Sequence, residues 1–188
     1  ETVRKRYNIR FDKFSIALIH PVTTNLKNLK KESEIFFSAL VKTNLNYIII
    51  FPNNDLGSEI ILKEIYKLKN NNKFRIFPSI RFEYYLTLLK NSKFIIGNSS
   101  SGIMEAPYYG VTTINIGTRQ SNRLKTKLIK NISFNEKEII KTINQIKNRK
   151  IIKRKFFGEG NSAKKIEKLL LSNKIWNISK QKNFIDLI

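Results

Sequence analysis

Residues 94–107, which read FIIGNSSSGIMEAP, decide the fold of this chain. Residues 94–97 have the apolar pattern of a short buried strand, residues 98–102 form a loop of small polar side chains, and residues 103–109 begin a helix. This order points the free main-chain N–H groups of a helix N-terminus at the loop. Phosphate is the usual occupant of such a place. The stretch therefore predicts an α/β fold with an anion site at the end of a strand.

Strands and helices alternate on both sides of this stretch. Short apolar runs predict strands over 14–19, 47–51, 74–78, 94–97 and 112–116. Apolar residues at helical spacing predict helices over 32–41, 58–68, 82–89, 103–109, 136–146 and 163–171. The alternation predicts a doubly wound, Rossmann-like parallel sheet that is covered by helices on both faces. We expect this domain to span residues 14–171, after a lead-in over 1–13 and before a tail over 172–188.

Composition excludes several classes of site. The 188 residues allow one good-sized core. The chain has no cysteine and one histidine, so disulfides and metal centres built from Cys or His clusters are excluded. Since no apolar run reaches 18 residues and the first residues are charged, we expect a cytoplasmic protein with no membrane contact, no metal and no cofactor.

The formal net charge of +22 has two interpretations. An excess of 36 Lys and Arg over 14 Asp and Glu is compatible with a basic binding module for nucleic acid or another polyanion. However, Lys is scattered along the whole chain, and Asn and Ile are also over-used, which is typical of a compositional bias. Clusters of aromatic residues with Arg, which bind nucleic acid, are missing. We therefore expect no nucleic-acid partner.

Polar residues gather where the predicted strands end. They are His20, Asn53–Gly57, Ser79, Asn98–Gly102 and Gly117–Arg123. Parallel sheets of this class bind ligands at the carboxyl ends of their strands, near a topological switch point. Small residues, one carboxylate and two guanidiniums thus meet at one edge of the sheet. This combination predicts a site for a nucleoside diphosphate.

The loop at 99–102 and the helix after it supply the first candidates. Ser99, Ser100, Ser101 and Gly102 suit phosphate oxygens, or the serines only cap the helix. A serine capping box has Glu or Gln three residues later, and none of these serines has one. Glu105 suits two ribose hydroxyls because its carboxylate offers two acceptor oxygens, although the helix dipole alone also favours an acidic residue there.

The other candidates lie on the neighbouring loops. Arg119 and Arg123 suit charge-assisted hydrogen bonds to a diphosphate, or are ordinary surface residues of a basic chain. His20 suits proton transfer or a hydrogen bond to a leaving phosphate, or is a polar strand end. Asn53 either faces the ligand or belongs to a plain turn.

Five ordered motifs make the chain similar to the carboxyl-terminal half of the UDP-N-acetylglucosamine 2-epimerases, over about residues 14–171. They are His20-Pro21-Val22-Thr23, Asn53-Asn54-Asp55-x-Gly57-Ser58, Gly97-Asn98-Ser99-Ser100-Ser101-Gly102-Ile103-x-Glu105, Asn115-x-Gly117-Thr118-Arg119-Gln120-x-x-Arg123 and Phe157-Gly158-Glu159-Gly160-Asn161-Ser162. The motif that begins at His20 resembles the hydrolysing branch, because the other branch usually has His-Arg there.

The resemblance implies the carboxyl-terminal, UDP-binding lobe of a two-lobed glycosyltransferase-B fold. The family eliminates UDP across C1–C2 of UDP-N-acetylglucosamine to give a glycal. In the hydrolysing branch, water then adds and N-acetylmannosamine and UDP leave, for sialic-acid-type sugars. The implied partners are UDP and a UDP-N-acetylhexosamine, with a homodimer as the state of the full-length protein.

The resemblance also assigns residue roles. His20 is the implied catalytic residue and lies by the leaving group. The diphosphate is held by the 99–102 loop, the ribose by the carboxylate of the following helix, and the uracil by the loop at 77–79. The implied UDP-binding residues are Asn53, Ser79, Ser99, Ser100, Ser101, Gly102, Glu105, Arg119 and Arg123.

One departure from the family concerns length. Members are about twice as long, and the amino-terminal lobe that supplies most of the catalytic carboxylates is missing from this chain. An excised domain or truncated product of this kind is expected to bind UDP and to epimerise poorly or not at all. The donor-binding lobe of a glycosyltransferase of the same fold is the alternative, and the Arg119-Gln120-x-x-Arg123 segment favours the epimerase over it.

Overall fold

The computed structural model describes residues 2–146 and 155–181, and it divides the chain into two compact units at residues 1–154 and 155–188. The first unit contains the sheet. The elements are α1 (Thr2–Arg6), β1 (Ser15–Leu18), η1 (Thr23–Asn28), α2 (Leu29–Lys42), β2 (Tyr47–Ile50), α3 (Ser58–Lys67), β3 (Phe74–Phe77), α4 (Phe82–Asn91), β4 (Phe94–Gly97), α5 (Ser101–Tyr109), β5 (Thr112–Ile116), β6 (Ile129–Ile132), α6 (Glu136–Gln145), α7 (Ser162–Leu170) and α8 (Asn173–Trp176).

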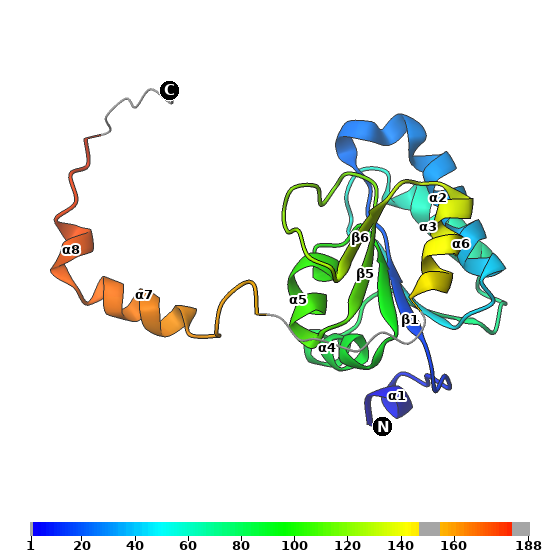
Figure 1. Ribbon diagram of the computed structural model, residues 1–188, viewed down its shortest axis with the longest axis horizontal. Coiled ribbons are helices and arrows are strands. Elements are labelled where there is room, and N and C mark those ends of the chain that lie inside the picture. Colours follow the sequence, from blue (N-terminus) through cyan, green and yellow to red (C-terminus); the bar gives the residue numbers. More distant parts are fainter. Residues whose placement is uncertain (1, 147–154, 182–188) are drawn as a thin grey trace. The chain divides into compact units, whose positions relative to one another are not determined.

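All pairings in the sheet are parallel, in the strand order β3-β2-β1-β4-β5-β6 (Figure 1). Ile16 of β1 pairs with Ile48 of β2 on one side and with Ile95 of β4 on the other. The chain steps outward from β1 to β3, returns to the centre and steps outward again from β4 to β6. The switch point of this doubly wound sheet therefore lies between β1 and β4, and the predicted fold class is confirmed.

Helices cover both faces of the sheet (Figure 1). On one face α2, α3 and α6 pack with strand residues such as Ala17, Ile49 and Ile96. On the other face α4 and α5 pack with Ile16 and Ile95, among others. Successive strand residues thus enter opposite cores, because side chains alternate along a strand. This burial on both faces explains why the strands lack polar alternation.

β6 was not predicted, so the expected five-stranded sheet is corrected to six strands. Ile129–Ile132 reads IKNI, with two polar residues between two apolar ones. β6 is an edge strand that pairs only with β5, and its two central residues are half-buried and exposed. A polar edge strand has no strong sequence signal because only part of it enters the core.

The helix starts also differ from the expected ones. α5 begins at Ser101 rather than at residue 103, and α2 begins at Leu29 rather than at residue 32. α1, η1 and α8 were not expected; all three are short. Element boundaries depend on a few local hydrogen bonds, so a periodic pattern places them only to within a few residues.

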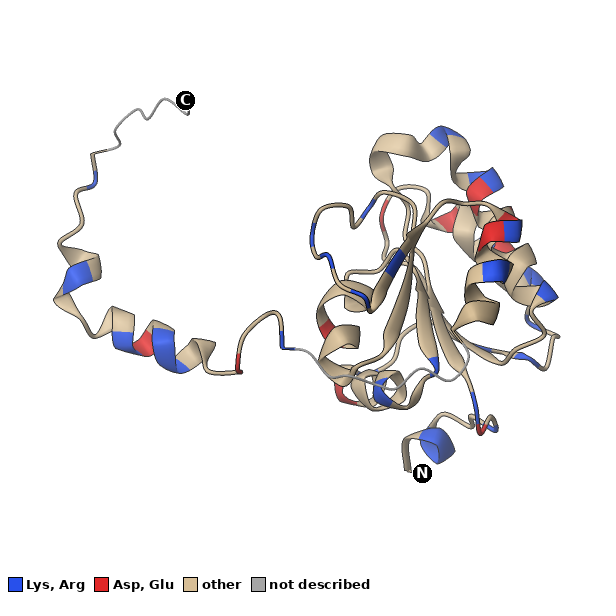
Figure 2. Ribbon diagram, in the orientation of Figure 1, with Lys and Arg blue, Asp and Glu red and all other residues tan. Residues whose placement is uncertain are grey.

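Charged residues are distributed over many elements (Figure 2). Lys and Arg lie on α1, α2, α6 and α7, and on α2 and α6 they alternate with Glu. None of the helices described is long and apolar enough to cross a bilayer.

The second unit contains α7 and α8. Trp176 Nε1 donates a hydrogen bond of 2.8 Å to the Leu170 carbonyl, which ties the two helices together. The proposed domain boundary at residue 171 stays a prediction, because the two units are described separately. Residues 182–188 of the expected tail lie outside the described part of the chain.

Candidate functional site

The candidate site begins where β4 passes the end of β1. Gly97 has φ +138°, and a Cβ built there would lie 1.9 Å from the carbonyl oxygen of Leu18. Only glycine permits this approach, since any side chain would collide with main chain. Because Gly97 has no Cβ, the loop after β4 can lie directly against the end of β1, at the switch point of the sheet.

Asn98 makes hydrogen bonds that connect the segments after β1, β4 and β5. Its Oδ1 accepts a hydrogen bond of 2.7 Å from the main-chain N–H of His20, and its Nδ2 donates one of 2.9 Å to the His20 carbonyl. The Asn98 carbonyl accepts from Gln120 Nε2 at 3.0 Å and from Arg119 Nη1 at 3.2 Å. Asn98 is 1% exposed, so these bonds are shielded from water. The ends of β1, β4 and β5 form one polar platform.

His20 is buried at this platform in a defined tautomer. Its Nδ1 accepts a hydrogen bond of 3.1 Å from the main-chain N–H of Asn53. A neutral imidazole with an accepting Nδ1 carries its proton on Nε2. Burial first, and then the charge of Arg119, lower the pKa of His20 to about 4, while Asp55 acts in the opposite direction. At neutral pH the imidazole is therefore an uncharged Nε2–H donor.

The hydrogen bonds at the start of α5 show whether Ser99, Ser100 and Ser101 only cap the helix or leave groups free to bind phosphate. Ser99 Oγ accepts a bond of 3.3 Å from the main-chain N–H of Ser101, which is a local turn contact. Ser100 is the N-cap residue, yet its side chain makes no capping hydrogen bond. Within residues 2–146 and 155–181, no partner is found for the main-chain N–H groups of Ser99 and Ser100. These two donors at a helix N-terminus suit an anion.

Glu105 lies one turn after Ser101 on α5, near Tyr85 of α4. The hydroxyls of Tyr85 and Ser101 share a hydrogen bond. Burial raises the pKa of Tyr85 to about 12, and the charge of Glu105 adds to this effect while the bond to Ser101 opposes it. Glu105 Oε2 is buried without a hydrogen-bond partner. A ligand hydroxyl would satisfy this acceptor, and an unsatisfied buried carboxylate oxygen is costly.

Gly102 has a packing role that the sequence did not reveal. A Cβ at Gly102 would lie 2.6 Å from Thr113 Cγ2, and Thr113 Oγ1 donates a bond of 2.6 Å to the Gly102 carbonyl. Gly102 therefore allows α5 to pack closely on β5. Its predicted contact with phosphate stays a prediction.

The remaining candidates are solvent-accessible. Asn53, Ser79 and Arg123 are exposed and Arg119 is half-buried. No hydrogen bond or ion pair in the described ranges joins Ser79 or Arg123 to the platform. The structure thus joins His20 and Arg119 through Asn98, and it joins Asn53 to His20 directly. The roles of Ser79 and Arg123 stay predictions.

Three residues of the site were given no role by the sequence: Asn98 and Gln120, which were expected only as part of the polar clusters at the strand ends, and Tyr85, which was not expected there at all. Asn98 and Gln120 stand inside motifs that were recognised, so their position was a usable signal. Tyr85 had no sequence signal, because its contact with Ser101 depends on the packing of α4 against α5. No group of three or more His, Cys, Asp or Glu residues suited to a metal ion occurs in the described part of the chain.

Sequence comparisons connect this chain to known proteins. Residues 1–171 match the family described as UDP-N-acetylglucosamine 2-epimerase. A UDP-N-acetylglucosamine 2-epimerase of Neisseria meningitidis serogroup B is 42% identical over 191 residues, which cover 100% of this chain and 50% of the relative. A GDP/UDP-N,N'-diacetylbacillosamine 2-epimerase (hydrolyzing) of Campylobacter jejuni is 34% identical over 138 residues, or 71% of this chain and 36% of the relative. The chain spans half or less of the length of these relatives.

Solved structures show the same architecture. The Methanocaldococcus jannaschii UDP-GlcNAc 2-epimerase in complex with UDP-GlcNAc and UDP aligns with a TM-score of 0.70 at 24% identity, over 90% of this chain and 48% of that one. The six-stranded parallel unit therefore corresponds to about half of such an enzyme. On the match over residues 1–171, the chain belongs to the UDP-N-acetylglucosamine 2-epimerase family.

Proposed function

We propose that this chain is the carboxyl-terminal, UDP-binding lobe of a hydrolysing UDP-N-acetylglucosamine 2-epimerase. The observation that carries the proposal is the platform in which Asn98 joins His20 and Arg119 beside the start of α5. A guanidinium, an Nε2–H donor and two unpartnered main-chain N–H groups provide the donors that a diphosphate needs. The hydrolysing activity is supported by the motif at His20 and by the hydrolysing relative from Campylobacter jejuni.

In this proposal each group has one task. Arg119 and the main chain at Ser99 and Ser100 bind the diphosphate, and Glu105 accepts hydrogen bonds from the ribose. His20 donates a hydrogen bond from Nε2 to the leaving phosphate. Because its pKa is about 4, His20 is a hydrogen-bond donor in the free protein and not a charged acid. A bound diphosphate would raise that pKa, since nearby negative charge favours the imidazolium.

The carboxylates that would abstract the proton from the sugar are assigned to the other lobe. This chain alone is therefore expected to bind UDP and to show little or no epimerisation. The full-length protein is expected to release N-acetylmannosamine and UDP, and to form a homodimer. Product analysis of the full-length protein separates this activity from glycosyl transfer.

The direct test is calorimetric titration of the chain with UDP at about 0.15 M salt, where non-specific surface attraction is largely screened. CDP and inorganic pyrophosphate are the competing ligands. We expect a preference for UDP that Glu105→Ala and Arg119→Ala each weaken by about tenfold or more, as loss of a hydrogen bond to a charged group implies. Arg10→Ala is the matched control, because this exposed arginine lies by the amino end of β3.

Equal, salt-sensitive binding of all three ligands would contradict the nucleotide site. That result would show that the net charge of +22 alone attracts anions, as in the basic-module alternative.

A further inference from the structure

A pocket of about 340 Å³ lies at the amino edge of the sheet, whereas the platform lies at the carboxyl edge. Its volume is in the range of small-molecule sites, about 300–1,000 Å³. One wall is formed by residues 8–11, which precede β1, and the other by the turn between α3 and β3 with the first residues of that strand. β3 is four residues long, which separates its two ends by about 13 Å. The pocket is therefore separate from the proposed nucleotide site.

Three cationic side chains line this pocket, those of Arg10, Lys69 and Arg75. Among the described residues, no Asp or Glu contributes to the lining, and none forms an ion pair with these three side chains. Asp12, which stands close to Arg10 in the sequence, instead accepts a hydrogen bond of 2.8 Å from Arg4. The positive charge of the pocket is thus left for a ligand to balance.

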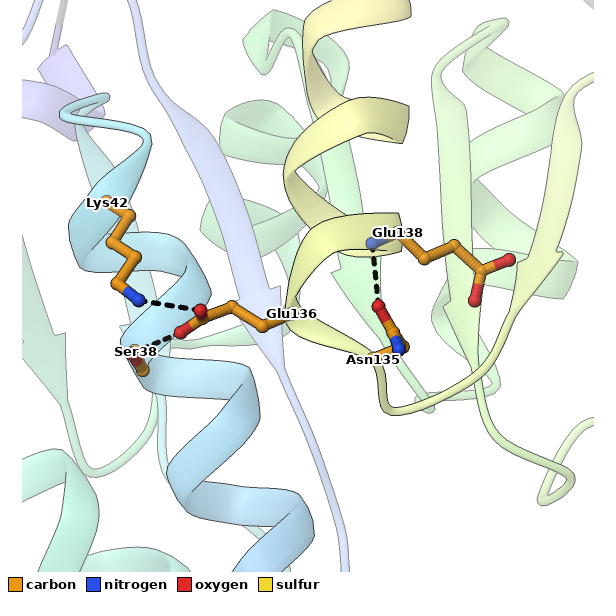
Figure 3. Close-up of polar contacts among 5 residues, drawn as sticks. All are labelled: Ser38, Lys42, Asn135, Glu136 and Glu138. Carbon is orange, nitrogen blue, oxygen red and sulfur yellow. Dashed lines mark hydrogen bonds and ion pairs between the residues drawn. The ribbon is translucent and has the colours of Figure 1, made fainter.

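Some basic residues elsewhere in the same unit are paired with acids. Lys42 Nζ on α2 donates a hydrogen bond of 2.6 Å to Glu136 at the start of α6 (Figure 3). Lys67 Nζ donates one of 2.6 Å to Glu64. Since lysine is common throughout the chain, a basic surface by itself indicates little. The pocket differs from such a surface because its three cations line one cavity.

Arg75 is held in position by its neighbours. Its Nε donates a hydrogen bond of 3.2 Å to the Asn8 carbonyl, and its Nη2 donates one of 3.3 Å to the Tyr7 carbonyl. Its Cζ lies 5.4 Å from the centre of the Phe77 ring, which is a cation–π distance. A guanidinium has five N–H donors, so Arg75 can bind an anion while it keeps both bonds. A side chain that is already positioned loses little conformational entropy on binding.

The turn between α3 and β3 is also fixed by its own hydrogen bonds. Asn71 Oδ1 accepts a bond of 3.0 Å from the main-chain N–H of Lys73, and the Asn71 carbonyl accepts one of 3.0 Å from the main-chain N–H of Phe74. Asn70 and Asn72 on either side are exposed and line the cavity. Their amide groups can both donate hydrogen bonds to a polar ligand and accept them from it.

We propose that this pocket binds a small organic phosphate. The cations Arg10, Lys69 and Arg75 bind the phosphate group, and Asn70 and Asn72 bind hydroxyl groups of the organic part. Three cations suit the nearly two negative charges of a phosphate ester better than the single charge of a carboxylate. The ligand would connect residues 8–11 with the turn before β3. This assignment does not depend on the proposed nucleotide site.

The test is an NMR titration of the ¹⁵N-labelled chain with glucose 6-phosphate at about 0.15 M salt. We expect saturable shifts of the main-chain amide signals of residues 70–75 and of the Nε–H signal of Arg75. His20 is the one histidine of the chain, and its imidazole signals, which report on the platform, should not move while the pocket fills. Inorganic phosphate and glucose should each bind at least about tenfold more weakly, because each lacks one part of the ligand.

Two variants test the cations. Arg10→Gln and Lys69→Gln each remove one charge from an exposed side chain and should weaken binding by about tenfold, as loss of a hydrogen bond to a charged group implies. Lys63→Gln is the matched control, because this exposed lysine of α3 lies outside the lining of the pocket, and it should leave the affinity unchanged.

Equal weakening by Lys63→Gln would show that net charge alone attracts the ligand, and it would overturn the proposal. Shifts at His20 without shifts at residues 70–75 would overturn it too, because the phosphate would then bind at the platform. Equal affinity for inorganic phosphate would reduce the pocket to an inorganic anion site. Citrate distinguishes the remaining source of negative charge. If citrate binds more tightly than glucose 6-phosphate, the ligand is a polycarboxylate and the phosphate assignment is wrong.

Discussion

Acidification is expected to destabilise this chain through one identifiable side chain, His20. Burial and the charge of Arg119 lower its pKa from 6.5 to about 4 in the folded chain, against the opposing charge of Asp55. In the unfolded chain the imidazole regains its ordinary pKa of about 6.5. Between these two values the unfolded state binds a proton that the folded state does not bind. The free energy of unfolding therefore falls as the pH falls from about 6.5 to about 4.

The size of the effect follows from the same pKa values. At 1.36 kcal/mol per pKa unit, lowering from 6.5 to about 4 corresponds to about 3.4 kcal/mol, reached in full only below about pH 4. Asp and Glu residues titrate in the same range, so the informative quantity is a difference between two proteins. His20→Gln is the matched variant, because its amide oxygen can still accept a hydrogen bond from the main-chain N–H of Asn53.

The assay is urea unfolding of the native chain and His20→Gln, followed by circular dichroism at several pH values from about 4.5 to 7. Relative to the variant, the native chain should lose stability with a slope of at most about 1.4 kcal/mol per pH unit. Since the chain has one histidine, its imidazole signals also give the pKa directly by NMR. A pKa near 6.5, or a stability difference that does not change with pH, would refute the reasoning. Added UDP should raise the pKa.

Two further changes test the architecture of the platform. Gly97→Ala should lower the free energy of unfolding, measured by urea denaturation, by more than about 4 kcal/mol, because its Cβ would lie 1.9 Å from the Leu18 carbonyl oxygen. The control is Gly158→Ala, which should lower it by only about 1 kcal/mol, because Gly158 has φ +106° but no atom within 4 Å of an added Cβ. Asn98→Ala should lower the free energy of unfolding by about 2–4 kcal/mol in the same assay, because it leaves the buried main-chain N–H and carbonyl of His20 unsatisfied. The control is Asn53→Ala, which removes an exposed side chain and should change the free energy of unfolding by less than about 1 kcal/mol. Equal losses in the paired variants would contradict the assigned roles of Gly97 and Asn98.

Apolar runs and helical spacing in the sequence determined the alternation of strands and helices. These signals are local, since a buried strand needs consecutive apolar residues and a covering helix needs an apolar stripe. They also placed the polar candidates at one edge, because every parallel strand points its carboxyl end the same way. His20, Ser99 and Arg119 were predicted as site residues by this argument. β6 was not predicted from the apolar pattern, because two of the four residues of this edge strand are polar.

Tertiary structure alone decided how the candidates act. The low pKa of His20 depends on its burial and on the charge of Arg119, and its tautomer depends on the hydrogen bond from Asn53. Arg119 and Asn53 lie far from His20 in the sequence. Gly102 of α5 packs against Thr113 of β5, and the start of α6 is held to α2 by the bonds of Glu136 with Ser38 and Lys42. Desolvation, hydrogen-bond geometry and steric fit are properties of atoms brought together by folding, whereas the sequence pattern reports only which residues a local element can bury.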